Sequence, residues 1–193
     1  MSKMKPKWYE LPVQRWQERR PDGERIWTDS QKNKLYTAER LFRGIYEGEI
    51  KKFSTQRVAQ EYVDEFIASE WVAQRFGKQE SVQVSLMSRT YCDSSQPQRK
   101  VRLSPWGMNE VVALHELCHI LQPHAVGTPH GRFFARNLLE SVGYKLGSRA
   151  MGMLRDSYVT FRVKCTPKPV YSKETKAKMR AIGLKRAAAL GWS

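Results

Sequence analysis

Residues 115–119 have the sequence His-Glu-Leu-Cys-His, in which two histidines stand four positions apart and a glutamate follows the first. On an α-helix, His115 and His119 lie on one face, one turn apart, so both imidazoles can bind the same Zn²⁺ ion. Glu116 is rotated by about 100° from His115 and can act as general base toward a water bound to that metal. Random shuffling of this composition gives roughly 0.005 such motifs per chain. The pattern therefore favours a zinc site over two ordinary hydrogen-bonded helix histidines.

A catalytic zinc ion commonly takes three protein ligands and keeps one position open for water, so a third ligand must come from elsewhere in the chain. All four histidines fall within sixteen residues. His130 is the preferred third ligand, because residues 123–129 begin and end with proline and let the chain reverse directly before it. His124 and Glu140 are the alternatives that the spacing leaves open.

The flanking residues predict the helix that the motif requires. Asn109 is a suitable N-cap and Pro123 ends the apolar run, so the motif helix is expected between them. Apolar residues at helical spacing resume after Gly131 and predict a helix to about Lys145. A further helix is expected after Ser148.

Two more helices are expected ahead of the motif. The first begins at Asp29 and ends near Gly48, with an apolar stripe formed by Leu35, Ala38, Leu41 and Ile45. The second begins at Ser54, a candidate N-cap, and ends at Gly77. Both would serve as scaffold for the core.

A small sheet is expected between these helices and the motif. Apolar and polar residues alternate in residues 81–87 and again in residues 101–103, which predicts strands that pair antiparallel. The connecting segment, residues 88–98, is a candidate border of the active-site cleft.

Composition and charge indicate one water-soluble domain with short extensions. The chain has 193 residues, of which 40% are hydrophobic and 27% charged, and no apolar run approaches the length of a membrane span. Three cysteines without a CxxC pair predict no disulfide framework, so a reducing, cytoplasmic location is expected. We therefore expect an arm at residues 1–28 that is basic and contains tryptophans, an α+β domain at residues 29–165, and a basic tail at residues 166–193.

The tail carries much of the charge. The formal net charge is +15, and residues 161–193 hold nine Lys or Arg against one glutamate, Glu174. A polyanion such as nucleic acid, bound without sequence preference, is the natural partner for such a segment. A tail that only solubilises the chain is the simpler alternative.

Two parts of the sequence resemble a known family. The motif at residues 115–119 and the segment Pro129-His130-Gly131-Arg132-Phe133-Phe134 are similar to the signature of the SprT-like metallopeptidases, in which a third histidine precedes a glycine. With Asp29-Ser30-Gln31 through Tyr36-Thr37-Ala38-Glu39 added, the chain most resembles uncharacterised metallohydrolases of actinobacteria and their phages. The resemblance covers about residues 29–160, and only the motif region is specific.

The resemblance implies a zincin-like α+β domain, in which N-terminal helices and a small antiparallel sheet precede the motif helix and a following His-Gly helix. It further implies that His115, His119 and His130 bind Zn²⁺ and that Glu116 is the general base of a peptidase. Some relatives carry a four-cysteine zinc ribbon near the C-terminus. Here only Cys165 stands near that place, so a second metal site is not expected.

The expected reaction is zinc-assisted hydrolysis of a peptide bond in a protein or peptide substrate. SprT-like relatives include proteases that remove proteins attached to DNA, so the resemblance and the basic tail together predict action on nucleic-acid-associated proteins. The sequence does not rank the candidate donors to the oxyanion, which are Arg132, Tyr144, Tyr158 and His124.

Two other functions remain as hypotheses. The first is a nucleic-acid-binding or assembly protein whose zincin-like fold keeps a structural or inactive metal site. A structural zinc ion normally has four protein ligands, so His124 or Cys118 would have to complete the set. The second is hydrolysis of a small amide or ester, for which the basic tail would be incidental.

Overall fold

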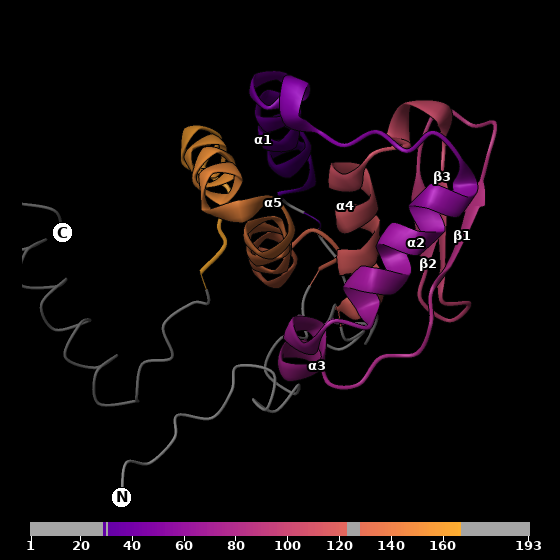
Figure 1. The fold of residues 1–193 in the computed structure, drawn as a ribbon. Helices are drawn as coiled ribbons and strands as arrows, with labels where there is room; N and C mark the ends of the chain where they lie inside the picture. The colour runs from indigo at the N-terminus through magenta and orange to yellow at the C-terminus, as the bar shows by residue number, and fades with distance from the viewer. Residues whose placement is uncertain (1–28, 30, 123–127, 167–193) are drawn as a thin grey trace, which may run out of the picture.

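Caps and turns divide the chain into short elements in a computed structural model, which describes residue 29, residues 31–122 and residues 128–166 (Figure 1). The predicted arm at residues 1–28 and nearly all of the predicted tail lie outside the described residues. In chain order the elements are α1 Lys32–Ile45, η3 Glu47–Glu49, α2 Gln56–Ile67, α3 Glu70–Phe76, β1 Gln83–Leu86, β2 Asp93–Ser95, β3 Lys100–Leu103, η4 Pro105–Gly107, α4 Glu110–Leu121 and α5 Arg132–Thr160.

The predicted α+β class is confirmed, but the sheet is mixed rather than antiparallel. Its strand order is β1-β3-β2, with β1 parallel and β2 antiparallel to β3. The predicted antiparallel pairing of residues 81–87 with 101–103 is wrong because β2 intervenes between them in the chain. The strand β2 has the sequence Asp-Ser-Ser, which lacks the alternation of apolar and polar residues that predicts a strand. A tight turn that includes Arg99 (φ 49°) joins it to β3 as a hairpin.

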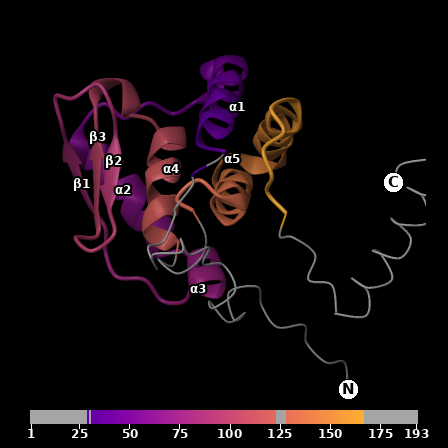
Figure 2. The ribbon, with the colours of Figure 1, turned by 180° about the vertical axis from the view of Figure 1, so that it is seen from behind.

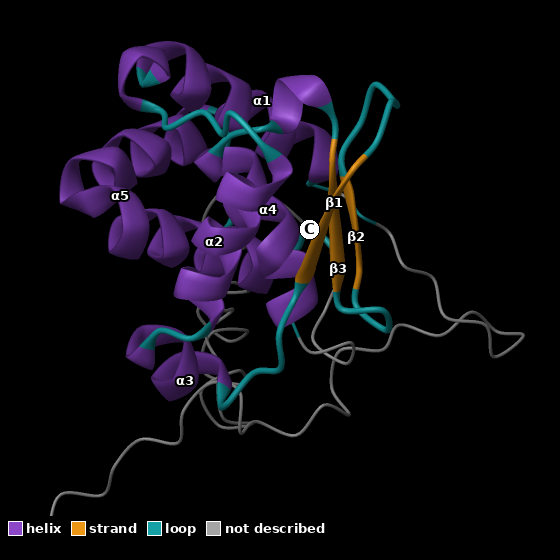
Figure 3. Cartoon of the chain, turned by 45° about the vertical axis from the view of Figure 1, so that its right-hand side comes forward, coloured by secondary structure: helices purple, strands orange, loops and turns teal. Residues whose placement is uncertain are grey.

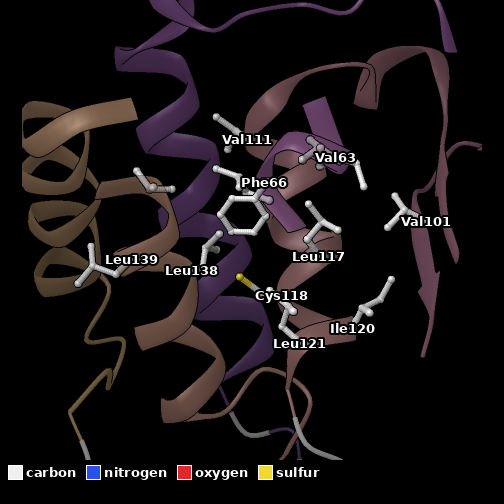
Figure 4. Packing of buried hydrophobic residues seen from close by; sticks show 14 of the residues in the cluster. Val63, Phe66, Val101, Val111, Leu117, Cys118, Ile120, Leu121, Leu138 and Leu139 are labelled. Atoms are coloured by element: carbon white, nitrogen blue, oxygen red, sulfur yellow. The ribbon is translucent and has the colours of Figure 1, made fainter. Parts of the chain in front are cut away.

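The helix α4 forms the centre of the domain, between the sheet and the pair α1 and α5 (Figures 1 and 3). Figure 2 shows α1 and α5 together on the side of α4 that lies away from the sheet. Nearly every residue of α4 is buried, so its apolar side chains pack in several directions at once. Figure 4 shows this core, where side chains of α4 lie close to Phe66 of α2 and Leu138 of α5, with Val63 of α2, Val101 of β3 and Leu139 of α5 farther out in the same cluster.

The buried face of α1 differs from the predicted stripe. Leu41 is 38% exposed and Ile45 is 59% exposed, whereas Leu35, Ala38 and Phe42 are fully buried against the core. These three follow i, i+3, i+7 spacing, which is one helix face. Glu39 lies on the same face and is buried with them.

The predicted second helix is two helices, α2 and α3, separated at Ala68 and Ser69. Thr55 rather than Ser54 caps α2, since its hydroxyl accepts a hydrogen bond from the backbone N–H of Val58. Ser69 caps α3 in the same way. Cap residues start helices, so Ser69 begins a new helix inside a pattern that looks continuous in sequence.

The expected helices after the motif are confirmed, on either side of Gly147. The long element α5 is interrupted there, because Gly147 has φ 90° and ψ 172°, a conformation open almost only to glycine. Among the described helices, none combines the length and the apolar character that crossing a membrane requires.

Candidate metal centre

The motif lies on α4 as predicted. The Asn109 side chain accepts a hydrogen bond from the Val112 N–H and caps the helix, which fixes where the following turns point. His115 is 4% exposed and His119 is half-buried one turn later. Their Nε2 atoms are 3.2 Å apart, so both rings present the same nitrogen to one point.

His130 completes the group from the turn that precedes α5. Gly131 closes this turn, with its N–H bonded to the carbonyl of Thr128, and a Cβ built there would lie 2.8 Å from the Thr128 hydroxyl oxygen. The ligand nitrogens of His115, His119 and His130 all lie within 4.8 Å of one another. The ring of Phe134, one turn into α5, packs against all three imidazoles, at a centroid distance of 4.3 Å from His119.

Two of these rings contact a carboxylate through Nδ1, the nitrogen that does not face the other histidines. Nδ1 of His115 lies 3.0 and 2.9 Å from the two oxygens of Glu39, and Nδ1 of His130 lies 2.5 Å from Oδ2 of Asp29. A carboxylate accepts only a proton-bearing nitrogen, so each ring carries its proton on Nδ1 and directs an Nε2 lone pair inward. This carboxylate–histidine arrangement is the donor set that fits a transition-metal ion such as zinc.

Protonation of the three rings is governed by burial and by these carboxylates. Burial lowers the pKa of His119 to about 2 and also lowers the pKa of His130. For His115, burial opposes the charged form, but the Glu39 carboxylate outweighs it and the pKa is raised. Metal ligation requires neutral imidazole, which His119 and His130 provide at neutral pH.

Glu116 faces a cavity beside the histidines rather than joining them as a ligand. Its side chain lines a cavity of about 530 Å³ together with His119, Tyr36 and residues 93–97. Burial raises the pKa of Glu116, while the neighbouring His115 and a hydrogen bond from Ser94 lower it. The prediction that residues 88–98 border the cleft is confirmed, since β2 forms one of its walls.

Tyr36 is a further candidate, which no motif in the sequence indicates. Its hydroxyl lies 3.1 Å from Nε2 of His130, and its ring stacks on His115 at a centroid distance of 5.5 Å. Burial raises the pKa of Tyr36 to about 12, so the hydroxyl keeps its proton at neutral pH. With Nε2 of His130 occupied by a metal ion, this proton would be available to an acceptor in the cavity that Glu116 lines.

The sequence motifs also assign no role to Glu39 or Asp29. The position of Glu39 on its helix is nevertheless unusual. It falls between Ala38 and Phe42 on the apolar face of α1, where an acidic residue needs a buried partner. No comparable pattern marks Asp29, which precedes α1 and is separated from His130 by 101 positions.

The competing candidates lie elsewhere. Glu140, in the first half of α5, is paired with Arg75 and Arg136 and is not part of the three-histidine group. Cys118 is fully buried in the apolar core (Figure 4), where burial raises its pKa to about 12, as expected for a small core residue. His124 lies outside the described residues.

Of the donors that the sequence could not rank, the three that lie among the described residues do not line the cavity. Arg132 donates to the backbone carbonyl of Thr166, and Tyr144 stacks on Trp71 at 5.0 Å. Tyr158 is fully buried in the core. Tyr36, which lines the cavity together with Glu116, therefore takes their place as the candidate donor to the oxyanion.

Comparisons with known proteins add no assignment. No protein-family model matches the chain, and no curated protein or solved structure matches it significantly.

Proposed function

We propose that this protein is a zinc-dependent hydrolase, and that its substrate is a peptide or protein. The observation that carries the proposal is the convergence of His115, His119 and His130 within 4.8 Å, with the buried carboxylate of Glu116 beside them in a cavity. Within the described part of the chain, the group has three members, which is the number typical of catalytic rather than structural zinc sites. An enzyme is thus favoured over the structural-metal alternative.

The resemblance to SprT-like metallopeptidases supports the same assignment. The two segments that carry it, residues 115–119 and residues 129–134, are separated in sequence but supply the three converging histidines. A zincin-like domain is accordingly the fold identity that we propose. The mixed three-stranded sheet and the central motif helix are compatible with it.

The side chains around the cavity suit hydrolysis of an amide. A zinc ion held by His115, His119 and His130 would supply Lewis acidity for the activation of water and the polarisation of a carbonyl. Glu116 accepts the proton of the attacking water and passes it to the leaving amine. Tyr36 donates a hydrogen bond to the substrate oxygen as negative charge develops there. Glu39 and Asp29 keep the His115 and His130 rings oriented through the reaction.

The test is the zinc content of the purified protein together with its hydrolysis of casein, followed by mass spectrometry of the fragments. We expect one zinc per wild-type chain, loss of zinc in His130→Ala, and retention in His124→Ala. In Glu116→Gln we expect zinc to stay while cleavage disappears. Zinc that is absent, or insensitive to His130, would contradict the site. Undiminished cleavage by Glu116→Gln would contradict the mechanism.

A further inference from the structure

A second cavity, of about 300 Å³, adjoins the one that Glu116 and His119 line. Tyr36, Cys92 and Glu116 contribute to the lining of both cavities. The smaller cavity therefore opens beside the place where Glu116 would act on a substrate. Its volume is at the lower end of the range of small ligand pockets, which suits a single side chain or chain terminus.

One wall of this cavity is a polar stripe on α1. Lys32, Tyr36, Glu39 and Arg43 follow spacings of four, three and four, so they share one helix face and all line the cavity. This stripe runs beside the apolar stripe that packs α1 on the core. Glu39 is buried, Tyr36 and Arg43 are half-buried and Lys32 is exposed, so the cavity has polar groups both in its interior and at its solvent edge.

The two carboxylates that line the cavity, one on α1 and one on α4, already have roles. Glu39 is bound to Nδ1 of His115, and Glu116 is the proposed general base. Lys32 and Arg43 are the cationic members of the lining. The Lys32 ammonium, which has three donors, is 5.9 Å from the centre of the Tyr36 ring.

Arg43 contacts an aromatic side chain, and one of its N–H groups is available to a ligand. Its guanidinium lies 5.5 Å from the centre of the Trp106 ring, and Trp106 is fixed by a 2.8 Å hydrogen bond from its indole N–H to the carbonyl of Thr90. Nε of Arg43 is buried, and among the described residues it has no hydrogen-bond partner. A buried donor without an acceptor is costly, and the edge of a guanidinium matches the two oxygens of a carboxylate.

We propose that the smaller cavity is a specificity pocket that binds a carboxylate of the substrate through Arg43, assisted by Lys32. The carboxylate is supplied either by an acidic side chain next to the scissile bond or by the C-terminus of the substrate. Trp106, which is 51% exposed, and Tyr91 form the aromatic rim that the rest of that residue would contact. This inference rests on the proposed function, because it assigns the substrate class of the same site.

Binding is measured first, on the Glu116→Gln variant, so that no turnover is needed. Three fluorescein-labelled peptides of otherwise identical sequence serve as probes: internal Glu with an amidated C-terminus, internal Gln with an amidated C-terminus, and internal Gln with a free C-terminus. We expect one carboxylate-bearing peptide to bind at least about tenfold more tightly than the amidated Gln peptide. Whichever of the two binds identifies the source of the carboxylate.

Arg43→Gln, added to Glu116→Gln, is expected to abolish this preference. Arg40→Gln is the matched control, since Arg40 lies on the exposed side of α1. If Arg43→Gln fails to fold by circular dichroism, Arg43→Lys replaces it, because lysine keeps the charge but lacks the paired donors. Equal binding of all three peptides, or a preference that survives at position 43 without arginine, would overturn the inference.

Cleavage of casein by the wild type separates this inference from the proposed function. If the wild type cleaves casein at sites that are neither enriched next to Asp or Glu nor enriched near the C-terminus of casein, that result would overturn the specificity pocket alone. A carboxylate preference in binding without any hydrolysis would contradict the hydrolase alone. Enrichment that disappears in Arg43→Gln and persists in Arg40→Gln would support both.

Discussion

Glu39 and His115 are 76 positions apart in sequence, yet both carboxylate oxygens of Glu39 lie within 3.0 Å of Nδ1 of His115. The contact joins α1 to α4 inside the core, where both side chains are almost completely buried. A buried carboxylate needs a strong donor, and a metal-binding imidazole needs an acceptor for its second nitrogen. The pair satisfies both requirements, so α1 is part of the site as well as of the scaffold.

Glu39→Gln is expected to weaken zinc binding by about 10- to 100-fold, because the neutral amide polarises and orients the His115 ring less well. The measurement is the zinc dissociation constant from competition with a chromophoric chelator. Glu47→Gln is the control, since Glu47 lies exposed on η3. An unchanged constant in Glu39→Gln would mean that the carboxylate only fills the core.

Tyr36→Phe is expected to lower kcat by about 100-fold, because one donor to the developing oxyanion is lost. KM and zinc content should change little, since the ring and its packing on His115 remain. Steady-state kinetics on a fluorogenic peptide measures the first two, and Tyr144→Phe, whose hydroxyl lies outside the cavity lining, is the control. A large loss of zinc instead of kcat would show that Tyr36 supports the metal rather than the substrate.

The acidic limb of the pH profile of kcat/KM should report the protonation of Glu116, because a general base acts only when ionised. Burial raises the pKa of Glu116, so this limb is expected at higher pH than for an ordinary glutamate. Asp93 raises the pKa further, whereas the hydrogen bond from Ser94 lowers it. Asp93→Asn should therefore move the limb to lower pH, and Ser94→Ala should move it to higher pH.

These two shifts have opposite signs, which makes the pair its own control. Removing Asp93 also frees the cationic side chain of Arg102, to which it is paired, and this change too favours ionised Glu116. Shifts of the same sign in both variants would mean that the limb belongs to another group.

Local sequence signals predict which three histidines come together. Asn109 and Pro123 bound the motif helix, and the HExxH spacing places His115 and His119 one turn apart whatever the rest of the fold does. His130 could be proposed because it stands at a turn directly before a helix, only eleven positions after His119. Such short separations leave the chain little choice of geometry.

Long-range partners were harder to find. Tyr36, Glu39 and Asp29 reach the histidines only because α1 packs against α4 and α5, and packing of distant helices leaves no spacing rule in the sequence. The predicted antiparallel pairing is wrong for a similar reason. The strand β2 is made of polar residues and is recognised only by its pairing with β3. The predicted apolar stripe of α1 is wrong at Leu41 and Ile45, because these two residues are apolar but face outward.

Gly147→Ala is expected to lower the free energy of unfolding by about 1–3 kcal/mol, because its φ of 90° is strained for any residue with a Cβ. Gly152→Ala is the matched control within the same element. Gly152 is helical and a methyl group added there would meet open space, so alanine should raise stability by about 0.4–1 kcal/mol. Urea unfolding followed by circular dichroism measures both changes, and equal effects at the two positions would contradict the break in α5.

Deletion of residues 166–193 is expected to weaken binding to duplex DNA strongly. The segment carries the basic residues Lys168, Lys173, Lys176, Lys178, Arg180, Lys185 and Arg186 against Glu174 alone. Contacts of such residues with phosphates release counterions, so the affinity of the full chain should fall by about 10³-fold between about 50 mM and 200 mM salt. Fluorescence anisotropy with a labelled duplex of arbitrary sequence measures both effects.

The deletion should leave zinc content unchanged, since all three proposed ligands lie before it. A full-length variant with those seven basic residues replaced by glutamine separates charge from chain length, because it should lose DNA affinity as the deletion does. Equal DNA affinity in the wild type and both variants would show that the tail acts only as a solubilising segment. In that case the net charge would carry no information about the substrate of the hydrolase.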